Sequence, residues 1–318
     1  MSKVRFGILG CADIAKRKII PAILASTDAE LICVASRDKN KGGEFGKTFN
    51  CIVLDSYDQL IQYDEIDVVY IPLPNSMHCE WAIKAAENGK HVLCEKSLAL
   101  NLQEAEKMVN AAKANNVVLF EAFVYQFHPQ HKQVKEIVKS GEIGDVKYVN
   151  IGFGFPEKDF NIRYVPELGG GALLDVGTYG IHFARNLFDQ EPTDIKCNTT
   201  IHKKYKVDWS GNVIMRFSDA VVNLYYAFGV YYQNFYEIVG TKGRIRIDPA
   251  FSIPPNLNPC IEIEVNNEVK TLPVDDCDQF FEEVNYFTSL VDTPNSWEIH
   301  YKDMIGQANT LDTILANF

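Results

Sequence analysis

Glu95 and Lys96 are the first residues in this chain whose types and position point to chemistry. They end the apolar run 91–94 in "HVLCEKSLAL". Charged groups are costly to bury without a partner, so a charged pair at the end of a buried strand needs a reason. The carboxyl ends of parallel strands face the crevice where open α/β sheets bind ligands. A lysine there can act as a general acid or base, or can hydrogen-bond a substrate oxygen.

A second group of reactive side chains follows a glycine run in "ELGGGALLDVGTYGIHFARNLF". The glycines at 169–171 allow a backbone to approach a ligand closely. Asp175, Tyr179 and His182 follow at steps of four and three, which place them on one face of a helix. A phenol and a lysine form a plausible proton-transfer pair. Taken singly, the same residues are also compatible with a helix cap, a core aromatic and a core or surface histidine.

The stretch "GILGCADIA" after the first strand has part of a dinucleotide-binding motif, which has the pattern G-x-G-x-x-G. Gly10 keeps the first glycine, and the small residues Ala12 and Ala15 replace the other two. A pyrophosphate can therefore still approach the backbone of Gly10, Ala12, Asp13 and Ile14 at the start of a helix. A simple tight turn would have the same local sequence.

The second and third strands add cofactor candidates at their carboxyl ends. The second strand ends in Ser36 and Arg37, a hydroxyl and a guanidinium that suit a 2′-phosphate better than a free ribose hydroxyl. NADP(H) is therefore favoured over NAD(H), the alternative being a solvated surface arginine. In "IPLPNSMH" we expect Pro74, Asn75 and His78 at the same edge of the sheet. An asparagine turn followed by a histidine at a helix start is the alternative.

The elements that must position these residues alternate between strand and helix over the first 120 residues. Apolar runs predict strands at Val4–Leu9, 31–35, 67–73, 91–95 and 117–122. Between them we expect a helix that Pro21 kinks, a helix that ends at Gly89, and a helix that a capping box of Asn101 and Glu104 begins. This alternation predicts a doubly wound parallel sheet of the Rossmann type.

The pattern changes after about residue 125. Period-two spacing at 149–155 predicts a half-buried strand, further strands follow up to 248, and a hairpin turns at Asn266 and Asn267. Helical spacing returns from Asp278. The fold class is therefore α/β: residues 1–122 as a Rossmann domain, and 123–318 as an α+β domain with a large, open, mostly antiparallel sheet. The open face of such a sheet needs a cover, which a second subunit can supply.

Composition limits the possible partners and surroundings. The net charge of −11 and the pI near 5.2 argue against nucleic acid or an anionic membrane as the main partner. We find neither a signal-peptide pattern at the N-terminus nor an apolar run of the roughly 20 residues that span a bilayer. The eight cysteines form no C-x-x-C pair, which favours reduced thiols in a cytoplasmic protein and disfavours a zinc site.

Taken together, "GILGCADIA", "PNSMH", "GKHVLCEK", "GEIGDV", "GGGALLDVGTYGIH" and "VGTKGRIRID" resemble one family over nearly the whole chain. This is the glucose-fructose oxidoreductase/inositol dehydrogenase (Gfo/Idh/MocA) family of NAD(P)-dependent dehydrogenases. The resemblance implies that Lys96 lies near the reacting oxygen of the substrate and Glu95 near the nicotinamide. It also implies that Tyr179 is the catalytic acid, in place of the histidine that many members have. Asp175 would orient the substrate or the lysine.

The resemblance also suggests substrate contacts at Arg163 and His182, and it shows two departures from the family pattern. Ser97 replaces the proline that follows the lysine, and Gln126 stands where arginine is frequent. The tyrosine points to a subgroup similar to dihydrodiol dehydrogenase, xylose dehydrogenase and some sugar-nucleotide 3-ketoreductases.

The implied reaction is hydride transfer between a nicotinamide and a carbonyl or hydroxyl carbon of a sugar, nucleotide-sugar or related polyol, without a metal. A homodimer or homotetramer through the second sheet is also implied. Two alternatives stay open. One is a relative that cleaves glycosides through transient oxidation of the sugar, and the other is a non-catalytic nucleotide sensor.

Overall fold

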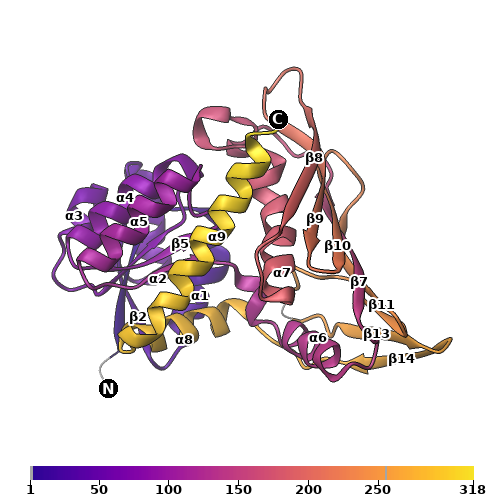
Figure 1. Cartoon of the computed structure of the whole chain (residues 1–318). Coiled ribbons are helices and arrows are strands. Elements are labelled where there is room, and N and C mark those ends of the chain that lie inside the picture. Colours follow the sequence, from indigo (N-terminus) through magenta and orange to yellow (C-terminus); the bar gives the residue numbers. More distant parts are fainter. Residues whose placement is uncertain (1–2, 255) are drawn as a thin grey trace. The chain divides into compact units, whose positions relative to one another are not determined.

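The computed structural model describes residues 3–254 and 256–318, and it divides the chain into two compact units (Figure 1). The first unit consists of Met1–Phe123 and Phe280–Ala308. The second consists of Val124–Gln279 and Asn309–Phe318. Among the described residues, no helix is long and apolar enough to cross a membrane.

This division differs from the predicted one in the C-terminal segment. The first boundary falls after Phe123, one residue beyond the prediction, but the helices of 280–308 group with the first unit instead of the second. Helix α8 (Gln279–Val291) packs there through Phe287, whose ring centroid lies 6.2 Å from that of Phe6. Helical periodicity shows that a segment has an apolar face, but not which sheet that face covers.

The first unit contains a six-stranded sheet with the order β3-β2-β1-β4-β5-β6, in which every pairing is parallel. The strands are β1 (Val4–Leu9), β2 (Ala29–Ala35), β3 (Ile52–Leu54), β4 (Val68–Ile71), β5 (His91–Glu95) and β6 (Leu119–Ala122). This confirms the predicted doubly wound parallel sheet. The strand order reverses between β1 and β4, and in such sheets the crevice at the carboxyl ends beside this reversal binds ligands.

The sequence predicts three helices of this unit, the one with Pro21, the one before Gly89 and the one after Asn101, and all three are present. The helices are η1 (Ala15–Ile19), α1 (Ile20–Ala25), α2 (Lys39–Phe49), α3 (Tyr57–Ile61), α4 (Asn75–Glu87), α5 (Leu102–Ala114), α8, and the part of α9 (Trp297–Leu315) up to Ala308. Pro21 lies in the first turn of α1, and Gly89 takes a positive φ of 71° after α4. Half of the predicted capping box forms, because Asn101 Oδ1 accepts the Glu104 amide at 2.9 Å. The Glu104 carboxylate accepts the amide of Leu100, not that of Asn101.

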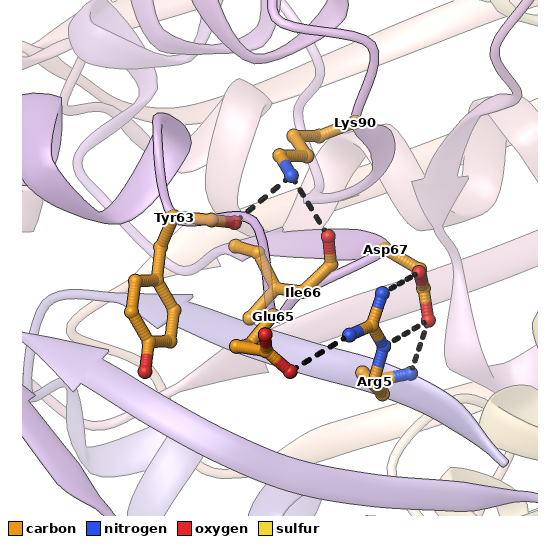
Figure 2. Close-up of polar contacts among 6 residues, drawn as sticks. All are labelled: Arg5, Tyr63, Glu65, Ile66, Asp67 and Lys90. Atoms are coloured by element: carbon orange, nitrogen blue, oxygen red, sulfur yellow. Dashed lines mark hydrogen bonds and ion pairs between the residues drawn. The ribbon is translucent and has the colours of Figure 1, made fainter.

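Two basic side chains hold the amino-terminal edge of the first sheet (Figure 2). Arg5 Nη2 lies 2.7 Å from Asp67 Oδ1, and the Arg5 amide donates to Asp67 Oδ2 at 2.9 Å. Lys90 Nζ donates to the carbonyl oxygens of Tyr63 and Ile66, both at 2.9 Å. These contacts fix the turns that enter β4 and β5 at the end opposite to the ligand-binding edge, so their role is structural.

The second unit contains an eight-stranded sheet with the order β14-β13-β12-β11-β7-β10-β9-β8. The strands are β7 (Val146–Phe155), β8 (Asp194–Ile201), β9 (Asp208–Phe217), β10 (Ala220–Phe228), β11 (Gln233–Gly240), β12 (Gly243–Ile247), β13 (Cys260–Val265) and β14 (Glu268–Pro273). Only the β7–β10 pairing of this sheet, among the described residues, is parallel, which confirms the mostly antiparallel prediction. Asn266 and Asn267 both have positive φ, as a two-residue hairpin turn requires.

Helices cover one face of the second sheet. The helical segments of this unit are η2 (Val124–Phe127), α6 (Pro129–Ser140), η3 (Ile162–Tyr164), η4 (Pro166–Leu168), η5 (Leu173–Gly177) and α7 (Thr178–Phe188). Helix α7 lies close to the strands because Gly180 has no side chain: a Cβ there would stand 2.5 Å from Leu224. Three residues later Phe183 stacks on Tyr236 of β11, with ring centroids 4.1 Å apart. The sheet thus positions the helix that carries Tyr179.

The opposite face of the second sheet carries a row of amides and exposed apolar side chains. Asn212 Nδ2 donates to Asn223 Oδ1 at 2.7 Å, and Asn223 Nδ2 donates to Asn150 Oδ1 at 3.0 Å. Ile214 is 44% exposed and Tyr148 is 38% exposed on the same face. An apolar and amide-lined sheet face of this kind is typical of a contact surface.

Candidate active site

The carboxyl end of β5 gives Glu95 a partner inside the first unit. The Tyr70 hydroxyl, from the neighbouring strand β4, donates to Glu95 Oε1 at 2.6 Å. Burial raises the pKa of Glu95, while the hydrogen bond from Tyr70 and the positive charge of Lys96 act in the opposite direction. The charges at the end of this strand therefore belong to a polar cluster, which the first unit builds at the edge where such sheets bind ligands.

His78 lies behind the turn that carries Lys96. Its ring is fully buried, with Nδ1 2.9 Å from the Ser97 carbonyl oxygen and Nε2 2.8 Å from the Leu73 carbonyl oxygen. Burial lowers the pKa of His78, so the ring is neutral and donates to one of these two carbonyls at a time. His78 thus ties the turn after β4 to the turn after β5, next to Lys96, and its cofactor contact stays a prediction.

The remaining residues at this edge surround the His78 link. The peptide bond between Lys96 and Ser97 is cis. Pro74 is the residue before α4, and Asn75 is the first residue of that helix. Both are half-buried, at the edge of the sheet where the sequence placed them.

The turn after β1 requires a glycine at its first position. Gly10 has a φ of 92°, and a Cβ there would stand 3.1 Å from Leu73 and 3.2 Å from the Tyr57 hydroxyl. Ala12 and Ile14 are half-buried, and the exposed Asp13 pairs with Arg17 at 3.3 Å. The turn therefore keeps the close packing of the dinucleotide motif with a single glycine.

The end of β2 presents a cationic group and no free carboxylate. Ser36 Oγ donates to the Asp38 carbonyl at 2.8 Å, and the Asp38 carboxylate caps α2 by accepting the amides of Asn40 and Lys41. Arg37 is exposed, with its guanidinium 5.6 Å from the centre of the Tyr57 ring. The acidic residue at this edge is thus engaged in a helix cap, and the side chain presented to solvent is an arginine.

In the second unit the structure brings Arg163, Asp175 and Tyr179 together. Arg163 Nε donates to Asp175 Oδ2 at 2.6 Å, and both side chains are partly buried. The charge of Asp175 raises the pKa of Arg163, and Tyr179 acts in the same direction. Asp175 belongs to the π-helical turn η5 and Tyr179 to the first turn of α7. These three predicted residues therefore form one polar group, which can orient a substrate beside a phenol.

The glycine run and Asp208 fix the start of the Tyr179 helix. Asp208 Oδ2 accepts the Leu173 amide at 2.6 Å, and a Cβ on Gly171 would clash with the same carboxylate. A Cβ on Gly170 would stand 2.5 Å from the Arg163 carbonyl oxygen. Burial raises the pKa of Asp208 to about 6. Gly170 and Gly171 thus allow the glycine run to pack closely against Arg163 and Asp208. Sequence reasoning missed Asp208, which lies in no motif.

His182 points into the interior of the second unit. It is 1% exposed, and its Nδ1 lies 2.7 Å from the Tyr125 hydroxyl. The Tyr125 ring lies 6.1 Å from the Tyr179 ring, centroid to centroid. His182 and Tyr125, which sequence reasoning did not single out, support the Tyr179 helix from within the unit, and the substrate contact of His182 stays a prediction.

No group of three or more His, Cys, Asp or Glu side chains in the described part of the chain is arranged to hold a metal ion. The parallel sheet with its reversal of strand order and the glycine turn after β1 define a protein of the Rossmann fold.

Comparison with known proteins identifies the family. The model described as "Oxidoreductase family, NAD-binding Rossmann fold" matches residues 4–123, and the GFO/IDH/MocA C-terminal domain model matches residues 131–246. The chain belongs to the Gfo/Idh/MocA family, as its motifs suggested, and it is an NAD(P)-dependent oxidoreductase.

Two relatives and one solved structure show which members of the family this chain resembles over nearly its whole length. A dTDP-3,4-didehydro-2,6-dideoxy-alpha-D-glucose 3-reductase from Saccharopolyspora spinosa is 36% identical, over 98% of this chain and 96% of its own. A D-xylose 1-dehydrogenase (NADP(+)) from Haloferax volcanii is 33% identical, over 97% and 95%. A 3-ketoreductase from Actinomadura kijaniata, solved with NADP and TDP-benzene, superposes with a TM-score of 0.94 at 31% identity, covering 99% and 98% of the two chains.

Proposed function

We propose that this protein is an NADPH-dependent reductase of a ketone carbon on a nucleotide-linked sugar. The observation that carries the proposal is the Arg163–Asp175 ion pair beside Tyr179, in a chain that matches a nucleotide-sugar 3-reductase from end to end. The ion pair supplies a fixed polar group for a sugar, and the phenol supplies a proton donor.

The residues at the ends of β1 and β2 fit NADP(H) better than NAD(H). Gly10 provides the tight turn that brings the backbone close to a pyrophosphate. Asp38 is engaged in capping α2, whereas the exposed guanidinium of Arg37 is free to face solvent and suits a 2′-phosphate. The xylose dehydrogenase and the 3-ketoreductase named above, which use or bind NADP, support this preference.

The cofactor supplies a hydride to the carbonyl carbon of the substrate. Tyr179 donates a proton to the carbonyl oxygen, and the Lys96 ammonium stabilises the negative charge that develops there. Asp175 and Arg163 hold the sugar in a reactive orientation, because each fixes the other. His78 and Asp208 hold the backbone that carries Lys96 and Tyr179, respectively.

An aromatic and basic surface next to Arg163 supports the nucleotide part of the substrate. Tyr164 and Tyr205 stack with their centroids 5.0 Å apart, and Phe160 beside them is 67% exposed. Lys158 Nζ lies 4.4 Å from the Phe155 ring centre, and other basic residues of this surface are Lys203 and Lys204. The exposed ring of Phe160, supported by the buried Tyr164 and the half-buried Tyr205, can stack on a base. The ammonium groups can pair with a diphosphate, in a chain whose net charge is −11.

The first experiment is a fluorescence titration of the purified protein with NADPH and NADH. We expect micromolar NADPH binding, and we expect Arg37→Ala to weaken NADPH binding at least tenfold while NADH binding stays the same. Lys39→Ala, an exposed neighbour, is the matched control. If the wild type binds neither cofactor, the reductase proposal fails.

The second experiment compares substrates by following NADPH oxidation. A dTDP-linked 3-keto-sugar should be reduced with a kcat/KM at least a hundredfold above that of the free keto-sugar. Lys158→Ala should reduce this ratio of kcat/KM values. NADP⁺-dependent oxidation of a free aldose, as the name of the Haloferax relative suggests, would favour a free-sugar dehydrogenase instead.

A further inference from the structure

Helix α8 carries a buried carboxyl group that the proposed mechanism does not use. Glu283 is 0% exposed, and neither of its carboxyl oxygens has a hydrogen-bond partner among the described residues. An ionised carboxylate without a partner is very unfavourable in an apolar interior, whereas a protonated one is much less so. The burial of Glu283 without a partner therefore raises the question of whether its carboxyl group is protonated.

The packing of α8 shows which way Glu283 points. Phe287 lies four residues further on, so both side chains share one face of the helix. The Phe287 ring lies 6.2 Å from Phe6 of β1 and 6.2 Å from Phe120 of β6, centroid to centroid. This face of α8 therefore lies against the first sheet, within the first unit.

The register of the first sheet places Tyr70 and Glu95 on that same face. Ile8 pairs with Tyr70, Tyr70 with Leu93, and Leu93 with Phe120. Paired residues of neighbouring parallel strands point to the same side, and Glu95 shares the side of Leu93 because it lies two residues further along β5. Glu283 thus faces the side of the sheet on which Tyr70 donates its hydrogen bond to Glu95.

We propose that Glu283 stays protonated in the folded protein, so that the cluster of Tyr70, Glu95 and Glu283 carries one negative charge. In this scheme Glu283 affects the site only through the total charge of the cluster. Only the consequence for the cofactor rests on the proposed function; the protonation state does not.

The surrounding charges favour the proton on Glu283 over Glu95. Burial raises the pKa of Glu283, and the charge of Glu95 raises it further. Glu95 has stabilising neighbours that Glu283 lacks, namely the Tyr70 hydroxyl and Lys96. Other titratable groups of this region are Cys94 of β5, Glu121 of β6, Glu282 and Tyr286 of α8, and His300 of α9. Two carboxyl groups in one apolar site do not both ionise at neutral pH.

The number of negative charges in this cluster affects the relative affinity of the site for the oxidised and the reduced nicotinamide. The oxidised nicotinamide ring is cationic and the reduced ring is neutral, so each negative charge near it favours NADP⁺ over NADPH. The proposed function places Glu95 beside that ring. Protonation of Glu283 thus prevents a second charge from shifting the balance against the reduced cofactor.

Infrared spectroscopy of the full chain without cofactor tests the protonation state. At about pH 8 Asp208, with a pKa of about 6, is ionised and does not interfere. The wild type should show the carbonyl stretching band of a buried carboxylic acid, and Glu283→Gln should lack it. Glu282→Gln, which changes the exposed neighbour, should keep the band. A band that survives Glu283→Gln, or a wild type without one, overturns the proposal.

A second variant tests the coupling and does not depend on the folding of Glu283→Gln. In Glu95→Gln the carboxylic acid band should disappear at a lower pH than in the wild type, by at least one pH unit, because the neighbouring charge is gone. An unchanged midpoint would show that the two carboxyl groups are independent, which contradicts the proposal.

Cofactor titrations separate this inference from the proposed function. At neutral pH the ratio of NADP⁺ to NADPH affinity should agree within about threefold between wild type and Glu283→Gln, because both carry one charge in the cluster. A ratio that changes tenfold or more contradicts the single charge. If the wild type binds neither cofactor, the proposed function fails, while the infrared result on Glu283 stands.

Discussion

In the proposed mechanism Tyr179, which lies beside the Arg163–Asp175 ion pair, is the proton donor of the second unit. Asp175 and Arg163 satisfy one another, with Nε and Oδ2 2.6 Å apart. A carboxylate already paired with a guanidinium is a poor acid, whereas a phenol can donate a proton to a developing alkoxide. The division of tasks among these three residues is therefore set by their mutual contacts.

Replacing Tyr179 with phenylalanine should test this division directly. The substitution removes one hydroxyl and preserves the ring contact with Phe153, whose centroid lies 5.4 Å away. We expect kcat to fall about a hundredfold or more, with NADPH affinity unchanged, because general-acid catalysis contributes on that scale. Steady-state kinetics and a cofactor titration check this, with Tyr63→Phe, at the opposite edge of the first sheet, as the control. Full activity of the Tyr179 variant would assign the proton to another donor.

Asp208 acts on the same helix from outside the motif. Asp208→Asn weakens the contact with the Leu173 amide, so the start of the Tyr179 helix should become less well positioned. We expect kcat/KM to fall about tenfold with NADPH affinity unchanged. The wild-type profile of kcat/KM against pH should show a step near 6 that the variant lacks, because the pKa of Asp208 is raised to about 6. Identical profiles would exclude a positioning role.

Helix α6 contains the buried His131, and the buried His128 caps its amino terminus. Burial lowers the pKa of His131 to about 3 and that of His128 to about 4. His131 is neutral in its contacts with the Ala250 carbonyl and the Tyr236 hydroxyl. The segment is therefore sensitive to acid, since charging either ring would place a cation in an apolar environment.

The pH dependence of unfolding follows from these two histidines. Between about pH 6.5 and 4 the unfolded chain binds more protons than the folded chain, so the free energy of unfolding falls as the pH falls. Each histidine contributes up to about 1.4 kcal/mol per pH unit in this window. Urea titrations should show a weaker dependence for His131→Gln than for the wild type. Parallel curves for the two proteins would contradict the neutral state of His131.

The turns at the amino-terminal edge of the first sheet depend on Lys90 (Figure 2). Burial lowers the pKa of Lys90, and its ammonium satisfies two carbonyl oxygens. Lys90→Met should destabilise the protein by about 1–3 kcal/mol because both carbonyls lose their donor. NADPH affinity should not change, since the carboxyl ends of the strands lie at the opposite edge. The exposed Lys47→Met is the control, and equal stability of the two variants would contradict the assignment.

At the scale of the whole molecule, the uncovered face of the second sheet is suited to bind a second copy of the chain. Its amide row from Asn150 to Asn212 and its exposed Ile214 and Tyr148 offer both hydrogen bonds and apolar area. We propose a homodimer, or a homotetramer built from such dimers, through this face. The assembly would bury the one broad sheet surface that carries exposed apolar side chains among the described residues.

Sedimentation of the purified protein tests this assembly. The wild type should sediment as a dimer or larger, and the double variant Tyr148→Glu/Ile214→Glu should sediment as a monomer, because four glutamates would meet across a two-fold interface. Leu257→Glu, at another exposed apolar residue, should leave the assembly intact. A monomeric wild type would contradict the proposed assembly.

Local patterns determined most of the architecture from the sequence. Apolar runs such as Val4–Leu9 and 91–95 appear as strands with the predicted bounds, and the positive φ of Gly10 and of Asn266 follows from residue type. The cluster of Arg163, Asp175 and Tyr179 could be suspected because two of its members lie on one helix. Such features depend on neighbours within a few residues, so period and propensity reveal them.

Only the tertiary structure decided which distant side chains meet. It buried His78 and His182, paired Tyr70 with Glu95, and placed Asp208 at a helix start 35 residues earlier in the chain. It also grouped 280–308 with the first unit, and with them the unpaired carboxyl of α8. A short sequence window shows that a residue is polar or that a helix has an apolar face. The partner of each depends on how segments far apart in the chain pack, and that packing is set by the free energy of the whole core.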